Sequence, residues 1–516
     1  MKKFAIVLAA LAVALVSCTK GGEQEKDTTP ARLLSFEILK ADNAFLDKDY
    51  SAELIAPTMV IRIPGGGMDK SFTAVVKVGE FDKLYVNGAK VELQDATAKV
   101  QFQGKFAVDI EVVNEKSSKS AAYEVKIGKI LENKVSKVSS YSEPSTTLKS
   151  EVFLAVNPTT NAPYLLYARK STAEGATDSN NRLACVKYEG KAFANVGTLG
   201  FTADSRQAIA CDLAFCGETP YVLYYGESAA NIPAVRKFDG TEWAFVGGNE
   251  WGTKINASTG KPGLFFVSGN PAFVANGNNG KTDPGYRNAT VFTFDGTAWS
   301  SAAGIAGLPK YGEKGGNDGN FYVGVPTTDD KGNVYVVTST NLYGYYLFKA
   351  TNGWEKLVDN FVPVGDKTYG VPSSLSAQVA PDGTVYVLAA IAGKGQYQLY
   401  KYDSAQASFT PCGSPIQLTA GGSDTVSETM KIGINPVSSE IIGVYASYTE
   451  KELYFASFGK DGQWNEFVKV ADAGTLAASD AFDLVYAPDG TAYIATVGAV
   501  GIDVFKYAQE DDILPE

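Results

Sequence analysis

The chain has 516 residues, a formal net charge of −11 and no histidine. An acidic protein repels phosphate backbones, which argues against nucleic-acid binding. Without histidine there are no imidazole metal ligands and no Ser–His or Cys–His nucleophile pairs, so we expect neither metal nor cofactor, and the sequence identifies no catalytic residue.

The first residues have the layout of a secretory signal. Lys2 and Lys3 precede an apolar stretch that runs from Phe4 to Val16 and ends at Ser17-Cys18. This layout predicts a signal peptide over residues 1–17, and the stretch is too short for a spanning helix. The ending Leu15-Val16-Ser17-Cys18 resembles the lipobox of bacterial lipoproteins. The resemblance implies that Cys18 is lipidated and anchors the protein to a membrane.

Residues 18–30 follow as a polar segment with no apolar side chain after Cys18. Such a segment buries nothing, which predicts a flexible tether. An acidic tether behind a lipidated cysteine resembles the surface-export signal of Bacteroidota lipoproteins. This resemblance implies an outer-membrane protein exposed at the cell surface, with attachment facing the periplasm as the alternative.

Residues 31–130 contain short stretches in which apolar and polar residues alternate, as in Leu34–Ile38, Met59–Ile63 and Phe72–Val76. Alternation interrupted by turns such as Asn87-Gly88 predicts a small antiparallel β-sandwich. The pattern resembles the immunoglobulin-like modules that follow the tether in many Bacteroidota surface lipoproteins, and implies a spacer.

The remainder of the chain is repetitive. An aromatic residue recurs at steps of 50, 56, 55, 55 and 55 residues, at Phe193, Trp243, Trp299, Trp354, Phe409 and Trp464. Pro-Asp-Gly at 381–383 and 488–490 lies between alternating stretches and predicts hairpins, because glycine supplies the positive φ of the turn. Each repeat therefore predicts four strands, which is the unit of a propeller blade, and the recurrent tryptophans are expected to pack between blades.

Seven such units can be counted, with first strands that begin near Val152, Ala208, Gly263, Phe321, Leu375, Met430 and Phe482. The last unit lacks a fourth strand after Val504–Tyr507, whereas an unassigned strand, Val135–Tyr141, precedes the first unit. Pairing these two would close the ring and cover an exposed edge. The predicted fold is all-β: a small β-sandwich followed by a seven-bladed β-propeller over residues 133–509, closed by an N-terminal strand. It resembles bacterial β-propeller lipoproteins.

Besides Cys18, the chain has Cys185, Cys211, Cys216 and Cys412. Their spacing matches no disulfide scaffold and no zinc motif. Free, buried thiols are favoured, and pairing of Cys185 with Cys211 or Cys216 remains the alternative.

The long connections that depart from the repeat lie on one predicted face of the propeller, where the B-to-C and D-to-A loops emerge. Aromatic rings bordered by amides and carboxylates suit sugar rings, and packing within the loops is the competing interpretation of each ring. The candidate ligand-binding residues are Trp251, Tyr286, Tyr311, Tyr343 and Tyr369.

The leading hypothesis is a cell-surface lipoprotein that binds a carbohydrate or a glycan-bearing partner on this loop-rich face. One alternative is a carboxylate-dependent glycoside hydrolase or polysaccharide lyase, and another is a protein-interaction scaffold of an envelope complex. The sequence favours a binding protein over an enzyme, because acids near the expected mouth discriminate little in an acidic chain. These acids are Glu313, Asp318, Asp366, Glu428 and Asp480.

Overall fold

A computed structural model of the chain describes residues 27–509 except 53, 55–56, 65, 67–70, 106, 143–147, 172–180, 204–210, 226–231, 249–261, 278–285, 302–307, 309–311, 313–320, 341–343, 351–352, 362–374, 392–394, 419–428, 448, 479–480 and 499–500. The predicted signal peptide, Cys18 and most of the predicted tether lie outside these residues. The described part is all-β, with one short 3-10 helix, η1 (Lys40–Asp42). In this part no helix has the length and apolar character needed to cross a membrane.

The chain divides into two compact units. Unit 1 comprises Met1–Glu132 and Gln509–Glu516, and unit 2 comprises Asn133–Ala508. Each unit is described by itself.

The described part of unit 1 contains two sheets. The first has the order β2-β1-β4-β7 and the second β3-β9-β8-β5-β6. Their strands are β1 (Leu33–Ile38), β2 (Tyr50–Ser51), β3 (Thr58–Ile63), β4 (Ser71–Val78), β5 (Asp82–Val86), β6 (Ala89–Val91), β7 (Thr97–Gln103), β8 (Ala107–Asn114) and β9 (Ser120–Lys129).

Alternate residues of both sheets form one apolar core, in which Phe36 and Phe72 of the first sheet join Ile61, Ile110 and Val125 of the second. Burial of every second side chain is what the period-two pattern predicts. The expectation of a purely antiparallel arrangement is wrong, because β3 and β9 pair in parallel. These two strands are far apart in the chain, so no hairpin turn forces them to run in opposite directions.

Unit 2 consists, in its described part, of seven four-stranded sheets. The first sheet contains β11 (Leu148–Val156), β12 (Pro163–Lys170), β13 (Asn181–Tyr188) and β14 (Phe193–Asn195). The second contains β15 (Asp212–Cys216), β16 (Thr219–Tyr225), β17 (Pro233–Phe238) and β18 (Trp243–Phe245). The third contains β19 (Gly263–Val267), β20 (Asn270–Asn276), β21 (Ala289–Phe294) and β22 (Trp299–Ser301).

The next three are β23 (Phe321–Thr328), β24 (Val334–Thr340), β25 (Gly344–Ala350) and β26 (Trp354–Phe361); β27 (Leu375–Val379), β28 (Val385–Ile391), β29 (Gln396–Asp403) and β30 (Ser408–Gln417); and β31 (Thr429–Ile434), β32 (Ile441–Ala446), β33 (Leu453–Ser457) and β34 (Val468–Lys469). The last sheet combines β35 (Phe482–Tyr486), β36 (Ala492–Val497) and β37 (Gly501–Gln509) with β10 (Asn133–Ser142).

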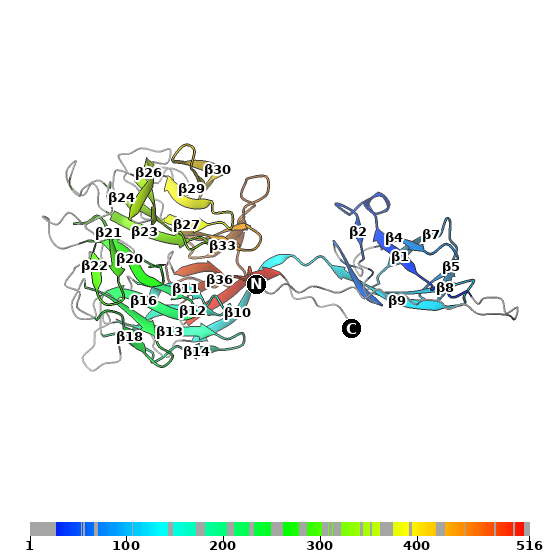
Figure 1. The fold of residues 1–516 in the computed structure, drawn as a ribbon, viewed down its shortest axis with the longest axis horizontal. Helices are drawn as coiled ribbons and strands as arrows, with labels where there is room; N and C mark the ends of the chain where they lie inside the picture. The colour runs from blue at the N-terminus through cyan, green and yellow to red at the C-terminus, as the bar shows by residue number, and fades with distance from the viewer. Residues whose placement is uncertain are drawn as a thin grey trace, which may run out of the picture. The chain divides into compact units, whose positions relative to one another are not determined.

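The last sheet differs from the other six because its strands come from both ends of the unit. Its order is β10-β37-β36-β35, so β10 is hydrogen-bonded to the final strand. An ion pair of 2.9 Å joins Lys137 Nζ to Asp503 Oδ1. A Cβ on Gly501 would collide with the carbonyl of Tyr141, so glycine permits the close approach of the two strands. In Figure 1 the red β37 lies beside the cyan β10.

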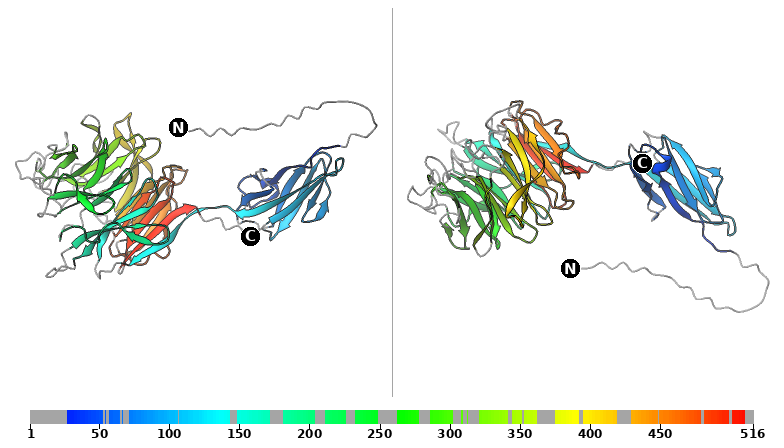
Figure 2. Two further views of the ribbon diagram at one scale, coloured as in Figure 1. Left: turned by 60° about the horizontal axis from the view of Figure 1, so that its bottom comes forward. Right: turned by 90° about the horizontal axis from the view of Figure 1, so that it is seen from above.

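The innermost strands of unit 2 contact one another in a cycle, from β11 through β15, β19, β23, β27, β31 and β35 back to β11. The sheets therefore follow one another in chain order around a propeller-like ring, which Figure 2 shows from two further directions. Predicted first strands at Gly263, Phe321, Leu375 and Phe482 begin at these residues. Ala208 lies outside the described residues, and the described part of that strand begins at Asp212.

The repeated tryptophans join neighbouring sheets. Trp243 Nε1 donates to Val196 O at 2.8 Å and Trp299 Nε1 donates to Val246 O at 2.7 Å, in each case across to the preceding sheet. Gly247, with φ of 74°, lies so close to the indole of Trp299 that a Cβ there would collide with the ring. Packing of these two tryptophans between sheets is confirmed.

Carboxylates on the inner strands also join sheets. Asp212 Oδ2 accepts from Leu264 N of the next sheet at 2.7 Å, and Asp483 Oδ2 accepts from Leu154 N at 2.8 Å. Lys431 Nζ contacts Asp483 Oδ1 at 2.7 Å. Burial raises the pKa of Asp212 to about 7, against the opposing effect of backbone N–H groups that donate to its carboxyl. The charges of Asp483 and Lys431 also act on Asp212, and they shift its pKa in opposite directions.

None of the four described cysteines forms a disulfide bond. Cys185 and Cys211 are buried, and burial raises the pKa of the Cys185 thiol. Cys216 and Cys412 are only partly buried. The prediction of buried thiols without disulfides is therefore confirmed for Cys185 and Cys211, whereas the expected burial is wrong for Cys216 and Cys412. The alternative pairing of Cys185 with Cys211 or Cys216 is not formed.

Candidate functional site

Most of the predicted site residues lie outside the described part of the chain. This holds for Trp251, Tyr311, Tyr343 and Tyr369, and for the five acids near the expected mouth. Tyr286 is described: its side chain is half-buried, and the Arg287 guanidinium lies 5.5 Å from its ring centroid. Grouping of the five aromatic residues on the loop-rich face stays a prediction.

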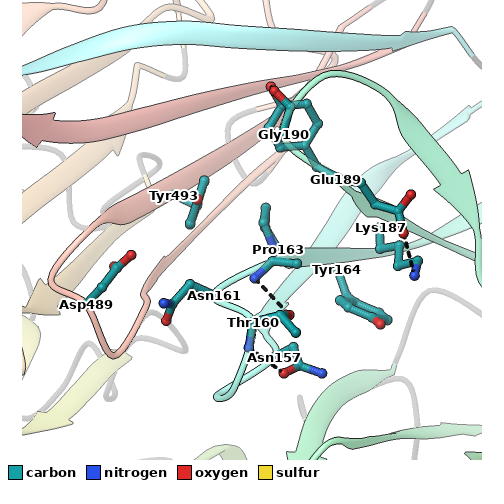
Figure 3. Close-up of a pocket in the computed structure, with 12 residues that line it drawn as sticks. Asn157, Thr160, Asn161, Pro163, Tyr164, Lys187, Glu189, Gly190, Asp489 and Tyr493 are labelled. Carbon is teal, nitrogen blue, oxygen red and sulfur yellow. Dashed lines mark hydrogen bonds and ion pairs between the residues drawn. The ribbon is translucent and has the colours of Figure 1, made fainter. Parts of the chain in front are cut away.

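A cavity of about 540 Å³ lies between the first and the last sheet of unit 2. It is lined by Asn157, Thr160, Asn161, Ala162, Pro163, Tyr164, Lys187, Tyr188, Glu189, Gly190, Asp489 and Tyr493 (Figure 3). These residues lie in the turns between the first and second and between the third and fourth strands, or on the strand ends next to these turns. In an antiparallel sheet such turns share one end, so the cavity is at the end opposite to the predicted loop-rich face.

The turn between β11 and β12 forms one wall of the cavity. Asn157 Oδ1 accepts from Thr159 N at 2.9 Å and from Thr160 N at 3.0 Å, so the side chain of Asn157 fixes the turn. Asn161 has a φ of 57°, a left-handed conformation that asparagine tolerates. The Oδ1 atom of Asn161 is buried and has no hydrogen-bond partner in the described part of the chain.

The end of β13 and the turn after it form the second wall. Tyr188 OH lies 2.7 Å from Gly190 O and 3.5 Å from Val138 O of the closing strand β10. Lys187 Nζ lies 2.6 Å from Glu189 Oε1, and this hydrogen bond raises the pKa of Lys187. The second wall therefore contains a neutralised ion pair and a phenol that contacts β10.

The third wall is the hairpin between β35 and β36. Asp489 Oδ1 accepts from Thr491 N at 2.9 Å, and Gly490 has a φ of 88°, as the Pro-Asp-Gly sequence predicts. Tyr493 follows on β36 and is half-buried. Burial raises the pKa of Tyr493, and the nearby negative charge of Asp489 adds to this shift.

Together the three walls combine phenol rings, carboxamides and charged groups in a space of ordinary size for a small-molecule site. Tyr164, Tyr188 and Tyr493 supply the rings and Asn157 and Asn161 the carboxamides. The described residues contain no group of three or more acidic or cysteine side chains placed to hold a metal ion. The arrangement suits a ligand with an apolar face and several hydroxyl groups.

The sequence interpretation missed this cavity because its residues belong to ordinary repeat positions. A signal was present in the turn Asn157–Asn161, whose Asn-Pro start recurs at Asn435-Pro436. What the sequence could not show is that residues 157–190 and 489–493 lie together, since this depends on how the ring closes.

No family model and no curated protein matches the chain. Among solved structures, it is similar to a mutant of the Aleuria aurantia lectin in complex with Fucalpha1-6GlcNAc, at 12% identity and a TM-score of 0.41, over 72% of this chain and 95% of that chain. AofleA from Arthrobotrys oligospora matches at 12% identity and a TM-score of 0.40, over 67% of this chain and 91% of that chain. A 6-phosphogluconolactonase-like protein from Bacteroides uniformis matches at 11% identity and a TM-score of 0.40, over 76% of this chain and 96% of that chain. Similarity at this level assigns neither a function nor a blade number.

Proposed function

We propose that the protein is an exported lipoprotein, anchored through Cys18 at the outer-membrane surface, that binds a carbohydrate in the cavity between the first and last sheets. In this proposal unit 2 is a seven-bladed β-propeller closed by β10, and unit 1 is an immunoglobulin-like spacer. The seven four-stranded sheets and the cycle of inner strands support the blade number.

The lining of the cavity is the observation that carries the proposal. Sugars present C–H faces that pack on aromatic rings and hydroxyls that bond to amides and carboxylates. Three tyrosines, two asparagines and Asp489 supply these groups on walls from two sheets. The alternative of a hydrolase or lyase gains no support here, because Glu189 is engaged by Lys187 and Asp489 caps its own turn.

The test is a glycan array followed by titration calorimetry, with protein that lacks residues 1–17 and carries Cys18→Ser. Tyr493→Ala should weaken glycan binding by roughly 1–3 kcal/mol, the scale known for aromatic stacking on nucleic-acid bases. Release of the full-length Cys18→Ser protein from the membrane fraction would test the anchor.

Tyr386→Ala is the matched control. Tyr386 is the second residue of β28, as Tyr493 is of β36, but it does not line the cavity. Its replacement should leave glycan binding unchanged. Wild-type protein that binds no glycan, or equal effects of the two substitutions, would contradict the proposal.

A further inference from the structure

Three charged side chains line the cavity, and two of them neutralise each other. Lys187 Nζ and Glu189 Oε1 are 2.6 Å apart, and the raised pKa of Lys187 keeps its ammonium group charged and paired. Asp489 is the third, and none of the ion pairs found among the described residues includes it. The cavity therefore carries one uncompensated negative charge.

The field of Asp489 reaches into the cavity, because its charge contributes to the raised pKa of the Tyr493 phenol. The carboxylate is exposed, and its Oδ1 atom accepts a hydrogen bond from Thr491 N. A carboxylate accepts hydrogen bonds and donates none, so it favours ligand groups that donate.

The turn between β11 and β12 contributes the carboxamide of Asn161, which contains an acceptor oxygen and an amino group that donates. The buried Asn161 Oδ1 has no hydrogen-bond partner in the described part of the chain, although buried carbonyl oxygens ordinarily have one. In Figure 3 the side chain of Asn161 points toward the turn that carries Asp489. Hydroxyl and ammonium groups could donate to the Asp489 carboxylate, whereas carboxylate and sulfate groups only accept.

From these contacts we infer that the cavity selects sugars by charge: it takes neutral sugars and amino sugars and excludes uronic acids and sulfated sugars. The inference rests on the proposed function. An anionic group placed beside Asp489 would bring a second negative charge next to its carboxylate. Repulsion of this kind weakens with salt, because Asp489 is exposed.

The experiment compares matched methyl glycosides that carry a hydroxymethyl, an amino or a carboxylate group, in both gluco and galacto configuration. Each is titrated into the protein that lacks residues 1–17 and carries Cys18→Ser. At low salt the neutral and amino sugars should bind at least ten-fold more tightly than the uronate of the same configuration, and 0.5 M salt should reduce this ratio.

Asp489→Asn tests the origin of the selectivity. Asparagine can still accept from Thr491 N, so the turn is kept while the charge is lost. The ratio between neutral sugar and uronate should fall at least five-fold. Asp382→Asn is the control, because Asp382 Oδ1 accepts from Thr384 N at 2.8 Å in the same type of turn on the fifth sheet, away from the cavity.

Uronate binding as tight as that of the neutral sugar, or an equal change of the ratio in both variants, would overturn the inference and leave the proposed function standing. Absence of binding to every glycoside and to the array would overturn the proposed function and the inference with it.

Discussion

The fifth and the last sheets of unit 2 have the same turn in different surroundings. Each has Pro-Asp-Gly between its first two strands, and the side chain of the aspartate accepts a hydrogen bond within the turn. In each, a tyrosine, Tyr386 or Tyr493, is the second residue of the strand that follows the turn. The fifth sheet is completed by the next strand in the chain, whereas the last is completed by β10. Only the last one lines the cavity. Local sequence thus determines the turn, and the closure of the ring determines whether the turn belongs to a site.

The largest loss of stability is expected from removing β10, the strand from the start of unit 2 that completes the last sheet. Deletion of residues 133–142 would expose the backbone edge of β37 and remove the Lys137–Asp503 ion pair. We expect aggregation or a loss of more than 10 °C in melting temperature, measured by calorimetry and size-exclusion chromatography. A deletion variant that melts like the parent would refute the role of β10 in closure.

A smaller loss of stability is expected from a change in the third sheet, whose four strands are consecutive in the chain. Trp299→Ala removes the packing between the third and second sheets and the hydrogen bond to Val246 O. It should cost about 3 kcal/mol of unfolding free energy, the lower end of the range for such truncations. Urea denaturation measures the loss, and glycan binding should persist because Trp299 does not line the cavity. Loss of binding at unchanged stability would instead locate a site near this ring.

The last prediction concerns the dependence of stability on pH. None of the ion pairs among the described residues includes Asp212, whereas Asp483 pairs with Lys431, and burial raises the pKa of Asp212 from 3.8 to about 7. The folded protein then binds more protons than the unfolded chain between pH 4 and pH 7, so this group makes stability fall as pH rises through that window. Asp212→Asn should reduce this loss of stability, measured as the difference between the urea midpoints at pH 4.5 and pH 7.5. An unchanged slope would show that the Asp212 carboxyl does not titrate there.

Much of the fold could be predicted because the aromatic period and the turns are local signals. The first strands at Gly263 and Leu375 follow from them, and so does the expectation of a late partner for the strand at Val135–Tyr141. The parallel pairing of β3 with β9 could not be predicted, since alternation fixes which side chains face the core but not the direction of a distant partner.

The cavity could not be predicted for a related reason. Asn161 and Tyr493 each have an ordinary local explanation, in a turn and in a strand. Their shared role arises only from the contact between the first and last sheets. The loop aromatic residues attracted the prediction because they depart from the repeat, and four of those five lie outside the described residues.

The closing strand also links the cavity to the point where the chain enters unit 2. The chain enters unit 2 through β10 and leaves it after β37, and these two strands are neighbours in one sheet. The hydroxyl of Tyr188, a residue that lines the cavity, contacts Val138 O of β10. One wall of the cavity therefore touches the strand by which the chain arrives from unit 1.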